Sequence, residues 1–275
     1  MKPDIGNVEQ VTAAVMEKLK YRYVHADLVK MLAEDEFAKG RTPKEAIKEV
    51  AGKLHQVAGA YFMRSPDYRQ WGEALDHLPD DIHHPNLQAY CVQIMRKHSS
   101  TAERIPILHE FFQTALEAIT PVKSILDLAC GLNPLALSWM PVTESTKYYG
   151  CDLYSDLASF MNGFYARIGR HGQFETCNLL DLDNPKKPAI NAQVAFLLKS
   201  VPCLDQLQKG AGLRLLESIP SPHILVSFPV SSLGGRAKGM RRNYEEQFMQ
   251  LIDGKDWQVD RFSFKTELAF LVKKQ

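Results

Sequence analysis

The N-terminal third of the chain has the hydrophobic spacing of helices. Apolar residues recur there at intervals of three or four: Val8, Val11, Val15 and Leu19. A helix is predicted to begin at Pro43, because Thr42 and Glu45 have the spacing of a capping box and proline is favoured at a first helical position. We therefore expect residues 1–104 to form a helical N-terminal domain.

From about Ile105 the pattern changes to short apolar runs separated by helical stretches. Seven runs are predicted as strands: Ser124–Leu128, Tyr148–Leu153, Phe174–Leu179, Val194–Leu198, Ile224–Phe228, Gln258–Phe264 and Leu268–Val272. Strands that alternate with helices predict a largely parallel sheet. Only residues 265–267 separate the last two runs, which predicts an antiparallel hairpin at the sheet edge. Residues 105–275 are thus expected to be an α/β, Rossmann-like domain with a mostly parallel seven-stranded sheet, the arrangement typical of class I methyltransferases.

The segment from Asp127 to Pro134 joins the first predicted strand to a helix expected to begin near Pro134. Gly131 would let the backbone approach a ligand closely, and Asp152 ends the next strand 21 residues later (152 − 131 = 21), the spacing of an acid that bonds ribose hydroxyls. A dinucleotide site would need three glycines where this loop has one. The pattern favours S-adenosylmethionine, with Asp127, Ala129, Gly131 and Asp152 in its site. A simple turn at Gly131 and a helix cap at Asp127 are the structural alternatives.

Two further strand ends belong to the same predicted edge of the sheet. After the third strand, Leu179 could pack on an adenine ring and either Asn178 or Asp181 could bond its amino group. The fourth strand ends at Lys199, where the methyl group would meet its acceptor. Lys199 is interpreted either as a contact to the target or as a solvated lysine, and the sequence pattern favours neither.

Several segments resemble the signatures of the aminoglycoside-resistance 16S rRNA guanine-N7 methyltransferases. They are His98–Arg104, Ala129–Ala136, Ser227–Pro229, Ser232–Met240, Asn243–Tyr244, Lys53–His55, Gly59–Tyr61 and Glu267–Leu268. The resemblance spans nearly the whole chain. It implies a helical domain that docks on rRNA, fused to a domain that methylates N7 of one guanine in the decoding-site helix of the assembled 30S subunit. It also implies S-adenosylmethionine as donor, S-adenosylhomocysteine as product and resistance to certain aminoglycosides.

The resemblance also implies roles for single residues. His98 and Arg104 would contact the cofactor, with the Arg104 guanidinium binding the carboxylate of the methionine moiety. Ser100 and Glu103 have the spacing of a capping box and are expected to cap a helix. Lys199 would position the target. Because guanine N7 carries a lone pair in the neutral base, the reaction needs positioning rather than a general base.

Charge narrows the RNA-binding surface. The chain holds 33 Lys+Arg and 32 Asp+Glu, which excludes a uniformly basic surface. Residues 231–242 instead contain four cations, three glycines and no acid, a composition that suits a phosphate backbone. The candidate RNA contacts are Lys20, Arg22, Lys53, His55, Arg236, Lys238, Met240, Arg241 and Tyr244. The N-terminal domain carries fewer cations than the resemblance leads us to expect, since residues 1–75 hold 12 Lys+Arg and 11 Asp+Glu.

Several further expectations complete the picture. Five widely spaced cysteines with no C-x-x-C pair argue against a zinc or other metal site and against a disulfide framework, and favour a reducing, cytoplasmic compartment. No apolar run is long enough to span a membrane. A monomer is expected.

Three rival functions are compatible with the pattern. A cytosine-C5 methyltransferase would use Cys203, which follows Pro202 after the fourth strand, as a nucleophile. The second rival is a non-catalytic rRNA-binding protein with the same fold. The third is a methyltransferase for small molecules, whose product would form without ribosomes.

Overall fold

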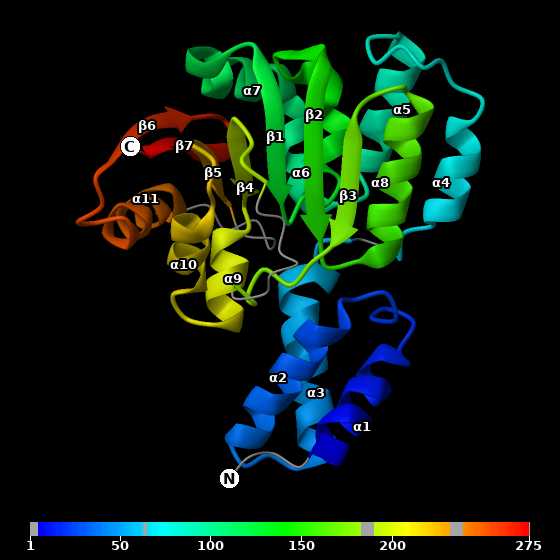
Figure 1. Cartoon of the computed structure of the whole chain (residues 1–275), viewed down its shortest axis with the longest axis vertical. Helices are drawn as coiled ribbons and strands as arrows, with labels where there is room; N and C mark the ends of the chain where they lie inside the picture. Colours follow the sequence, from blue (N-terminus) through cyan, green and yellow to red (C-terminus); the bar gives the residue numbers. More distant parts are fainter. Residues whose placement is uncertain (1–4, 63–64, 183–189, 232–238, 275) are drawn as a thin grey trace.

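The structure is a computed structural model that describes residues 5–62, 65–182, 190–231 and 239–274. One seven-stranded sheet runs in the order β3-β2-β1-β4-β5-β7-β6 (Figure 1). Its strands are β1 (Val122–Leu128), β2 (Val142–Asp152), β3 (Gly172–Thr176), β4 (Val194–Leu198), β5 (His223–Pro229), β6 (Trp257–Ser263) and β7 (Glu267–Lys274). Neighbouring strands are parallel except β7, which is antiparallel to both β5 and β6.

This architecture confirms the predicted fold class. All seven predicted strands are present, and the predicted bounds of the fourth, Val194–Leu198, are those of β4. The third strand was expected to reach Leu179 but ends at Thr176. Strand order reverses between β1 and β4, the kind of switch point at which parallel sheets bind ligands.

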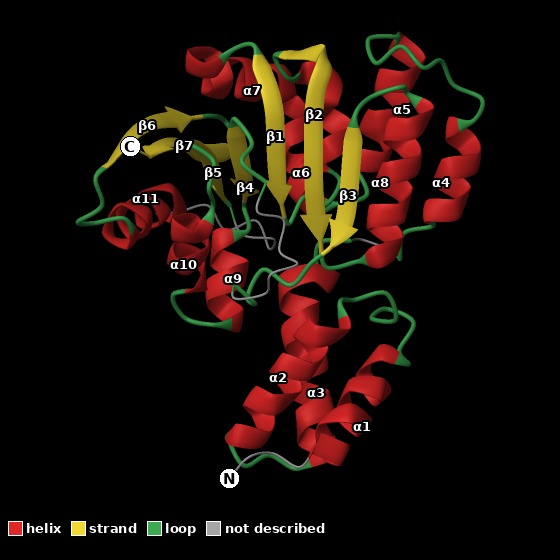
Figure 2. Ribbon diagram, in the orientation of Figure 1, coloured by secondary structure: helices red, strands yellow, loops and turns green. Residues whose placement is uncertain are grey.

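Helices surround the sheet on both faces and extend below it (Figure 2). In chain order they are α1 (Ile5–Met16), α2 (Ala26–Ala38), α3 (Pro43–Leu54), the π-helical turn η1 (His55–Gly59), α4 (Tyr68–Leu75), α5 (Pro85–Met95), α6 (Ser99–Arg104), η2 (Ile105–Ile107), α7 (Leu108–Leu116), η3 (Glu117–Ile119), the 3-10 helix η4 (Asn133–Trp139), α8 (Ser155–Arg167), α9 (Val201–Leu207), α10 (Ala211–Ser218) and α11 (Met240–Leu251). The capping box predicted at Thr42 and Glu45 is confirmed at the start of α3.

The sheet separates two hydrophobic clusters, and alternate residues of each central strand enter one or the other. In β4, Phe196 belongs to the cluster under α5, α7 and α8, whereas Leu197 belongs to the cluster under α9 and α10. Trp71 of α4 and Leu87 of α5 lie in the first cluster, so these two helices pack with the sheet. Helices α1–α3 form the bundle at the bottom of Figure 1 and add Leu28 to the second cluster. The division of the chain at residue 104 stays a prediction.

Backbone hydrogen bonds attach this bundle to the sheet. The His25 N–H donates to the Leu153 carbonyl at 2.8 Å, and the Ser155 N–H donates to the Tyr23 carbonyl at 2.9 Å. Val24 and Tyr154 form an isolated antiparallel bridge between these two bonds. The turn after α1 is therefore paired with the segment after β2.

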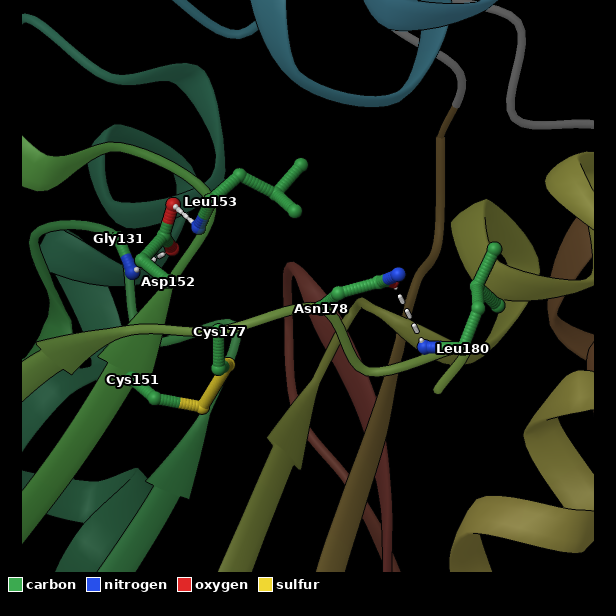
Figure 3. Close-up of a disulfide and its surroundings, with 7 residues drawn as sticks. All are labelled: Gly131, Cys151, Asp152, Leu153, Cys177, Asn178 and Leu180. Atoms are coloured by element: carbon green, nitrogen blue, oxygen red, sulfur yellow. Dashed lines mark hydrogen bonds between the residues drawn. A yellow bond between two sulfur atoms is a disulfide. The ribbon is translucent and has the colours of Figure 1, made fainter. Parts of the chain in front are cut away.

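The cysteine spacing argued against a disulfide framework, and the structure departs from that expectation at one pair. Cys151 and Cys177 form a disulfide, with their Cα atoms 5.8 Å apart (Figure 3). Cys151 lies near the end of β2 and Cys177 directly follows β3, so the register of two parallel strands brings together residues 26 positions apart. Cys91, Cys130 and Cys203 are free.

In the described part of the chain, no helix has both the length and the apolar character needed to cross a membrane. Over the same residues, no group of three or more His, Cys, Asp or Glu side chains is placed to hold a metal ion.

The disulfide predicts a simple thiol count. Alkylation of the denatured protein without reductant is expected to add three groups, at Cys91, Cys130 and Cys203, because the other two sulfurs are bonded. Prior reduction should raise the added mass to five groups, one for each cysteine of the chain. Intact-protein mass spectrometry measures both values, and five groups without reductant would contradict the pairing.

Candidate active site

A cavity of about 90 Å³ lies at the switch point, beside the carboxyl ends of β1 and β4. We call it the donor cavity. Six of the predicted site residues line it: His98, Arg104, Ala129, Gly131, Asp152 and Lys199. Ala129 and Gly131 have φ angles of +57° and +49°, so the chain leaves β1 through left-handed conformations. A Cβ on Gly131 would lie 3.4 Å from the His98 ring, and glycine therefore keeps this part of the cavity open.

Asp152 is held at the cavity wall by two backbone donors. Its Oδ2 accepts from the Gly131 N–H at 2.8 Å and its Oδ1 accepts from the Leu153 N–H at 2.7 Å (Figure 3). Burial raises the pKa of Asp152, and the backbone hydrogen bonds oppose that shift. Each carboxylate oxygen has a second lone pair, so Asp152 can also accept from ligand hydroxyls.

Asp127 stabilises the loop after β1 through buried hydrogen bonds. It is 1% exposed and is not among the described residues that line the donor cavity. Its Oδ2 accepts from the Tyr148 hydroxyl at 2.6 Å and from the Asn133 amide at 2.8 Å. Burial raises the pKa of Asp127 to about 6, against the effect of both hydrogen bonds. Asn133 opens η4, so the helix expected near Pro134 is a 3-10 helix whose first residue is fixed by Asp127.

A buried charge network lies behind the part of the wall formed by Arg104 and Lys199. Glu267, at the start of β7, is 0% exposed and accepts from Arg104 Nη2 at 2.6 Å and Nε at 3.0 Å. Lys199 Nζ lies 3.4 Å from the same carboxylate, and the Ser227 hydroxyl donates to it at 2.5 Å. Burial alone would raise the pKa of Glu267, but Arg104 and Lys199 hold it below its usual range. Arg104 Nη1 donates to Asn133 Oδ1 at 3.0 Å, which joins the network to the loop that follows β1.

Lys199 is not a solvated lysine, because it is only 5% exposed. Its backbone has a φ of +60°. Its ammonium donates to Glu103 at 2.7 Å and to the Ser100 carbonyl at 3.1 Å. The capping box expected for Ser100 and Glu103 was wrong: α6 has His98 at its N-cap with no side-chain capping bond. Glu103 instead uses its carboxylate to pair with Lys199.

His98 is stacked on Tyr61, with ring centroids 5.5 Å apart, and meets Phe62 edge-on at 4.8 Å. Burial, followed by the nearby charges of Lys199 and Arg104, lowers the pKa of His98 to about 3. Its Nδ1 is buried and has no hydrogen-bond partner in the described part of the chain. His98 is therefore a neutral ring with an unused polar atom at the donor cavity.

A smaller cavity of about 50 Å³ continues from the donor cavity, sharing Ala129 and Leu153 with it. Asn178 and Leu179 line this extension. Asn178 also lines a separate cavity of about 470 Å³ together with Asp181. Asn178 and Leu179 thus line the extension of the donor cavity, whereas Asp181 lines the separate cavity that Asn178 also borders.

On its other side the donor cavity adjoins a cavity of about 290 Å³, which we call the acceptor cavity. The two share Tyr61, Ser100, Lys199 and Cys203. Met240 and Tyr244, two predicted RNA contacts, line the acceptor cavity with Glu103. The Tyr244 ring is stacked on Phe228 with centroids 5.2 Å apart. Lys199 is therefore the predicted site residue common to both cavities.

The remaining RNA candidates lie in different settings. Lys20 and Arg22 are exposed on the turn after α1, and Lys20 Nζ lies 2.7 Å from His55 Nδ1. Lys53 is paired with buried Glu36 at 2.7 Å. Arg241 hydrogen-bonds Ser263 and donates to the Phe264 carbonyl at 2.9 Å. Arg236 and Lys238 fall outside the described residues.

Comparisons with known proteins identify this arrangement. The family model described as "Ribosomal RNA methyltransferase (FmrO)" matches residues 17–271. The chain belongs to this family. The match begins after α1 and ends within β7, and it includes every residue of the donor and acceptor cavities named above.

Individual relatives agree with the family. The chain is 32% identical over 272 residues to a protein of Micromonospora echinospora named 16S rRNA (guanine(1405)-N(7))-methyltransferase, covering 97% of both chains. A Frankia casuarinae protein of the same name is 33% identical, with 97% of this chain and 94% of that one covered. The crystal structure of the 16S rRNA methyltransferase RmtF in complex with S-adenosyl-L-homocysteine is similar with a TM-score of 0.81 at 28% identity, covering 99% and 100% of the two chains.

Sequence reasoning missed Glu103, Ser227 and Glu267 as parts of the site. Glu267 had a signal, because it is a single acid that precedes the apolar run of β7. Glu103 was hidden by its capping-box spacing, since both uses of a glutamate leave the same local pattern. Ser227 lies inside an apolar strand, and although it begins one of the segments that resemble the family, no role was assigned to it.

Removing Glu267 is expected to destabilise the fold strongly. Glu267→Ala leaves Arg104 and Lys199 buried without their shared counter-ion, and we expect the free energy of unfolding to fall by about 3–5 kcal/mol. Urea denaturation measures it. Glu246→Ala removes an exposed partner of Arg242 and should change little, as is usual for surface pairs. Equal effects of the two substitutions would show that the network carries no special weight.

The buried His98 predicts a pH dependence. The pKa of His98 in the folded state, about 3, lies below the ordinary value near 6.5. On acidification His98 is therefore protonated in the unfolded chain at pH values where it stays neutral in the folded chain. Stability should therefore decline as pH falls from about 6.5 towards 3. Between pH 6 and 5 this histidine should contribute a loss of about 1.2 kcal/mol. His98→Gln should remove that contribution, and parallel pH profiles for the two proteins would contradict it.

Proposed function

We propose that this protein transfers a methyl group from S-adenosylmethionine to N7 of the guanine at position 1405 of 16S rRNA, the activity that its relatives' names state. The observation that carries the proposal is that the donor and acceptor cavities meet at Lys199. The donor cavity is lined by the loop after β1, and the acceptor cavity is lined by the predicted RNA contacts Met240 and Tyr244. The choice of donor is supported by the RmtF structure, which is a complex with S-adenosyl-L-homocysteine. S-adenosylhomocysteine would be the second product.

The residues around the donor cavity suit S-adenosylmethionine, which supplies an activated methyl group when bound. Asp152 would accept hydrogen bonds from the ribose hydroxyls. Arg104 lines the cavity, and Nη1 and Nη2 each carry a second N–H with which to bind a carboxylate. Leu179 would pack on the adenine, with Asn178 or Asp181 as partner of its amino group; substituting each to alanine separately and measuring cofactor affinity decides between them.

The acceptor cavity would hold the flipped guanine. Guanine N7 has an available lone pair, so no residue needs to remove a proton from the target. The task of the chain is to orient the base and exclude water. The Glu103 carboxylate can accept from the N–H groups of the Watson–Crick edge while Lys199 fixes it in place, and Tyr244 offers a ring face for stacking.

Docking on the ribosome would involve the N-terminal residues. We propose that the protein acts as a monomer in the cytoplasm on the assembled 30S subunit and that the modification confers aminoglycoside resistance. Residues 1–104 would form the docking domain, with Lys20, Arg22, Lys53 and His55 near phosphates. Lys53 already forms an ion pair with Glu36, so Lys20 and Arg22 would contribute more to the attraction of rRNA phosphates. By their charge, Arg236, Lys238 and Arg241 would add further phosphate contacts.

A cytosine-C5 reaction is less compatible with this site. That chemistry requires a thiolate nucleophile. Burial raises the pKa of Cys203 above its ordinary value, although the hydrogen bond with the Tyr61 hydroxyl, 3.0 Å from the sulfur, acts in the opposite direction. Cys203 is thus held as a neutral thiol in the wall shared by the two cavities.

The decisive experiment is methyl transfer to purified 30S subunits, read by primer extension after N7-specific cleavage. We expect a single stop at guanine 1405. Asp152→Ala should raise the dissociation constant for S-adenosylmethionine roughly 100-fold, because hydrogen bonds to a charged acceptor are lost. Asp260→Ala, which removes a carboxylate on β6, is the matched control and should bind like the parent protein.

Each contrary result identifies a rival. No binding of S-adenosylmethionine would favour a non-catalytic rRNA-binding protein. A stop at another nucleotide would overturn the target. A methylated product formed without ribosomal subunits would favour a small-molecule enzyme.

A further inference from the structure

A further cavity, of about 300 Å³, lies between the helical bundle and the sheet domain. We call it the junction cavity. The residues that give it its chemistry are Lys20, Tyr23, Phe62, Tyr68, Tyr154 and Asp156. It shares Phe62 and Tyr154 with the donor cavity but not Gly131 or Asp152. It also shares no residue with the acceptor cavity, so it is separate from the proposed site of the target guanine.

The walls of the junction cavity are fixed by backbone pairing and ring packing. The bonds between Tyr23 and Ser155 and between His25 and Leu153 hold the turn after α1 against the segment after β2. The Tyr68 ring packs edge-on against Trp71, with centroids 5.1 Å apart. This is a preformed hollow between elements that are distant in sequence.

Four rings line the hollow, at Tyr23, Phe62, Tyr68 and Tyr154, together with one carboxylate at Asp156. The hydroxyl of Tyr68 is buried with no hydrogen-bond partner in the described residues, and burial raises its pKa, so it remains a neutral donor. A ligand that fits has flat apolar faces and an edge with both donors and acceptors. A nucleobase has both properties.

The mouth of the cavity indicates what carries the base. Lys20 and Arg22 are exposed there, and the Arg22 guanidinium lies 5.8 Å from the centre of the Tyr23 ring. In the described part of the chain only three large hydrophobic side chains are exposed, and two of them, Leu19 at 78% and Tyr23 at 46%, line this cavity. Cations beside an exposed ring suit a phosphate backbone that delivers a base.

We propose that the junction cavity binds an unpaired base of the substrate rRNA other than the target guanine. The inference rests on the proposed function only in taking rRNA as the partner. Tyr23 stacks on the base, Tyr68 donates to its edge, Asp156 accepts from an amino or ring N–H, and Lys20 lies beside its phosphate. A second base held here fixes the orientation of the subunit relative to the donor cavity, because Phe62 and Tyr154 separate the two cavities.

The test measures the affinity of the full-length protein for purified 30S subunits. Tyr23→Ala is expected to weaken binding about tenfold through loss of one stacked base, and Tyr23→Phe should restore it because the ring is retained. Met249→Ala is the matched control, since Met249 is another exposed hydrophobic side chain, 48% exposed on α11, and should bind as the parent does. The affinity of Tyr23→Ala for S-adenosylmethionine should be unchanged, which verifies its fold.

Chemical probing of the 30S rRNA identifies the ligand. The parent protein and Tyr23→Phe should protect one base besides the target, and Tyr23→Ala should not. Equal subunit affinity for Tyr23→Ala and the parent overturns the proposal. So does a loss of affinity without any additional protected base, since the partner is then not a nucleobase.

Failure of the proposed function is a separate result. Methylation at guanine 1405 with subunit affinity that is independent of the ring would leave the proposed function standing and refute the base site. Ring-dependent binding and base protection without methylation would do the reverse.

Discussion

The structure of this site depends on one buried carboxylate. Glu267 has no exposed surface, and an unpaired charge in that position would cost several kcal/mol. It is paired by Arg104 from α6 and by Lys199 from the end of β4, 163 residues away in the first case. The need to pair Glu267 therefore fixes α6 and the end of β4 against β7. Because Arg104 and Lys199 also line the donor cavity, the same requirement sets the shape of its wall.

The sequence predicted those features that depend on neighbours along the chain. The strands β1, β4, β5 and β7 are mostly buried apolar runs, so their pattern was visible in the sequence. Strand β4, buried at every residue, was predicted with its correct bounds. The spacing from Gly131 to Asp152 does bring the two residues together, because β1 and β2 are adjacent parallel strands; the Gly131 nitrogen lies 2.8 Å from Asp152 Oδ2. Its role in binding ribose stays a prediction.

Features that depend on partners distant in the sequence were missed, because the local pattern does not show which residues the fold brings together. Ser100 and Glu103 fit a capping box, yet Glu103 forms a stronger, charge-assisted bond to Lys199, 96 residues further on. Cys151 and Cys177 are paired only because β2 and β3 are in register. Helical spacing likewise shows that α4 and α5 have an apolar face but not which surface it covers. Both belong to a predicted docking domain and pack on the sheet.

Two strained residues and one neutral network explain how donor and acceptor can meet here. Ala129 and Lys199 are the only non-glycine residues with positive φ in the described ranges, and they follow the adjacent strands β1 and β4. Each turns the chain out of the sheet, so one side of Lys199 faces each cavity. Arg104 and Lys199 are balanced by Glu103 and Glu267, so this wall has no net charge. An unpaired Lys199 would repel a cationic methyl donor and a guanine that gains positive charge at N7. The paired lysine can instead hold Glu103 and the acceptor in place, which is all that a reaction without a general base requires.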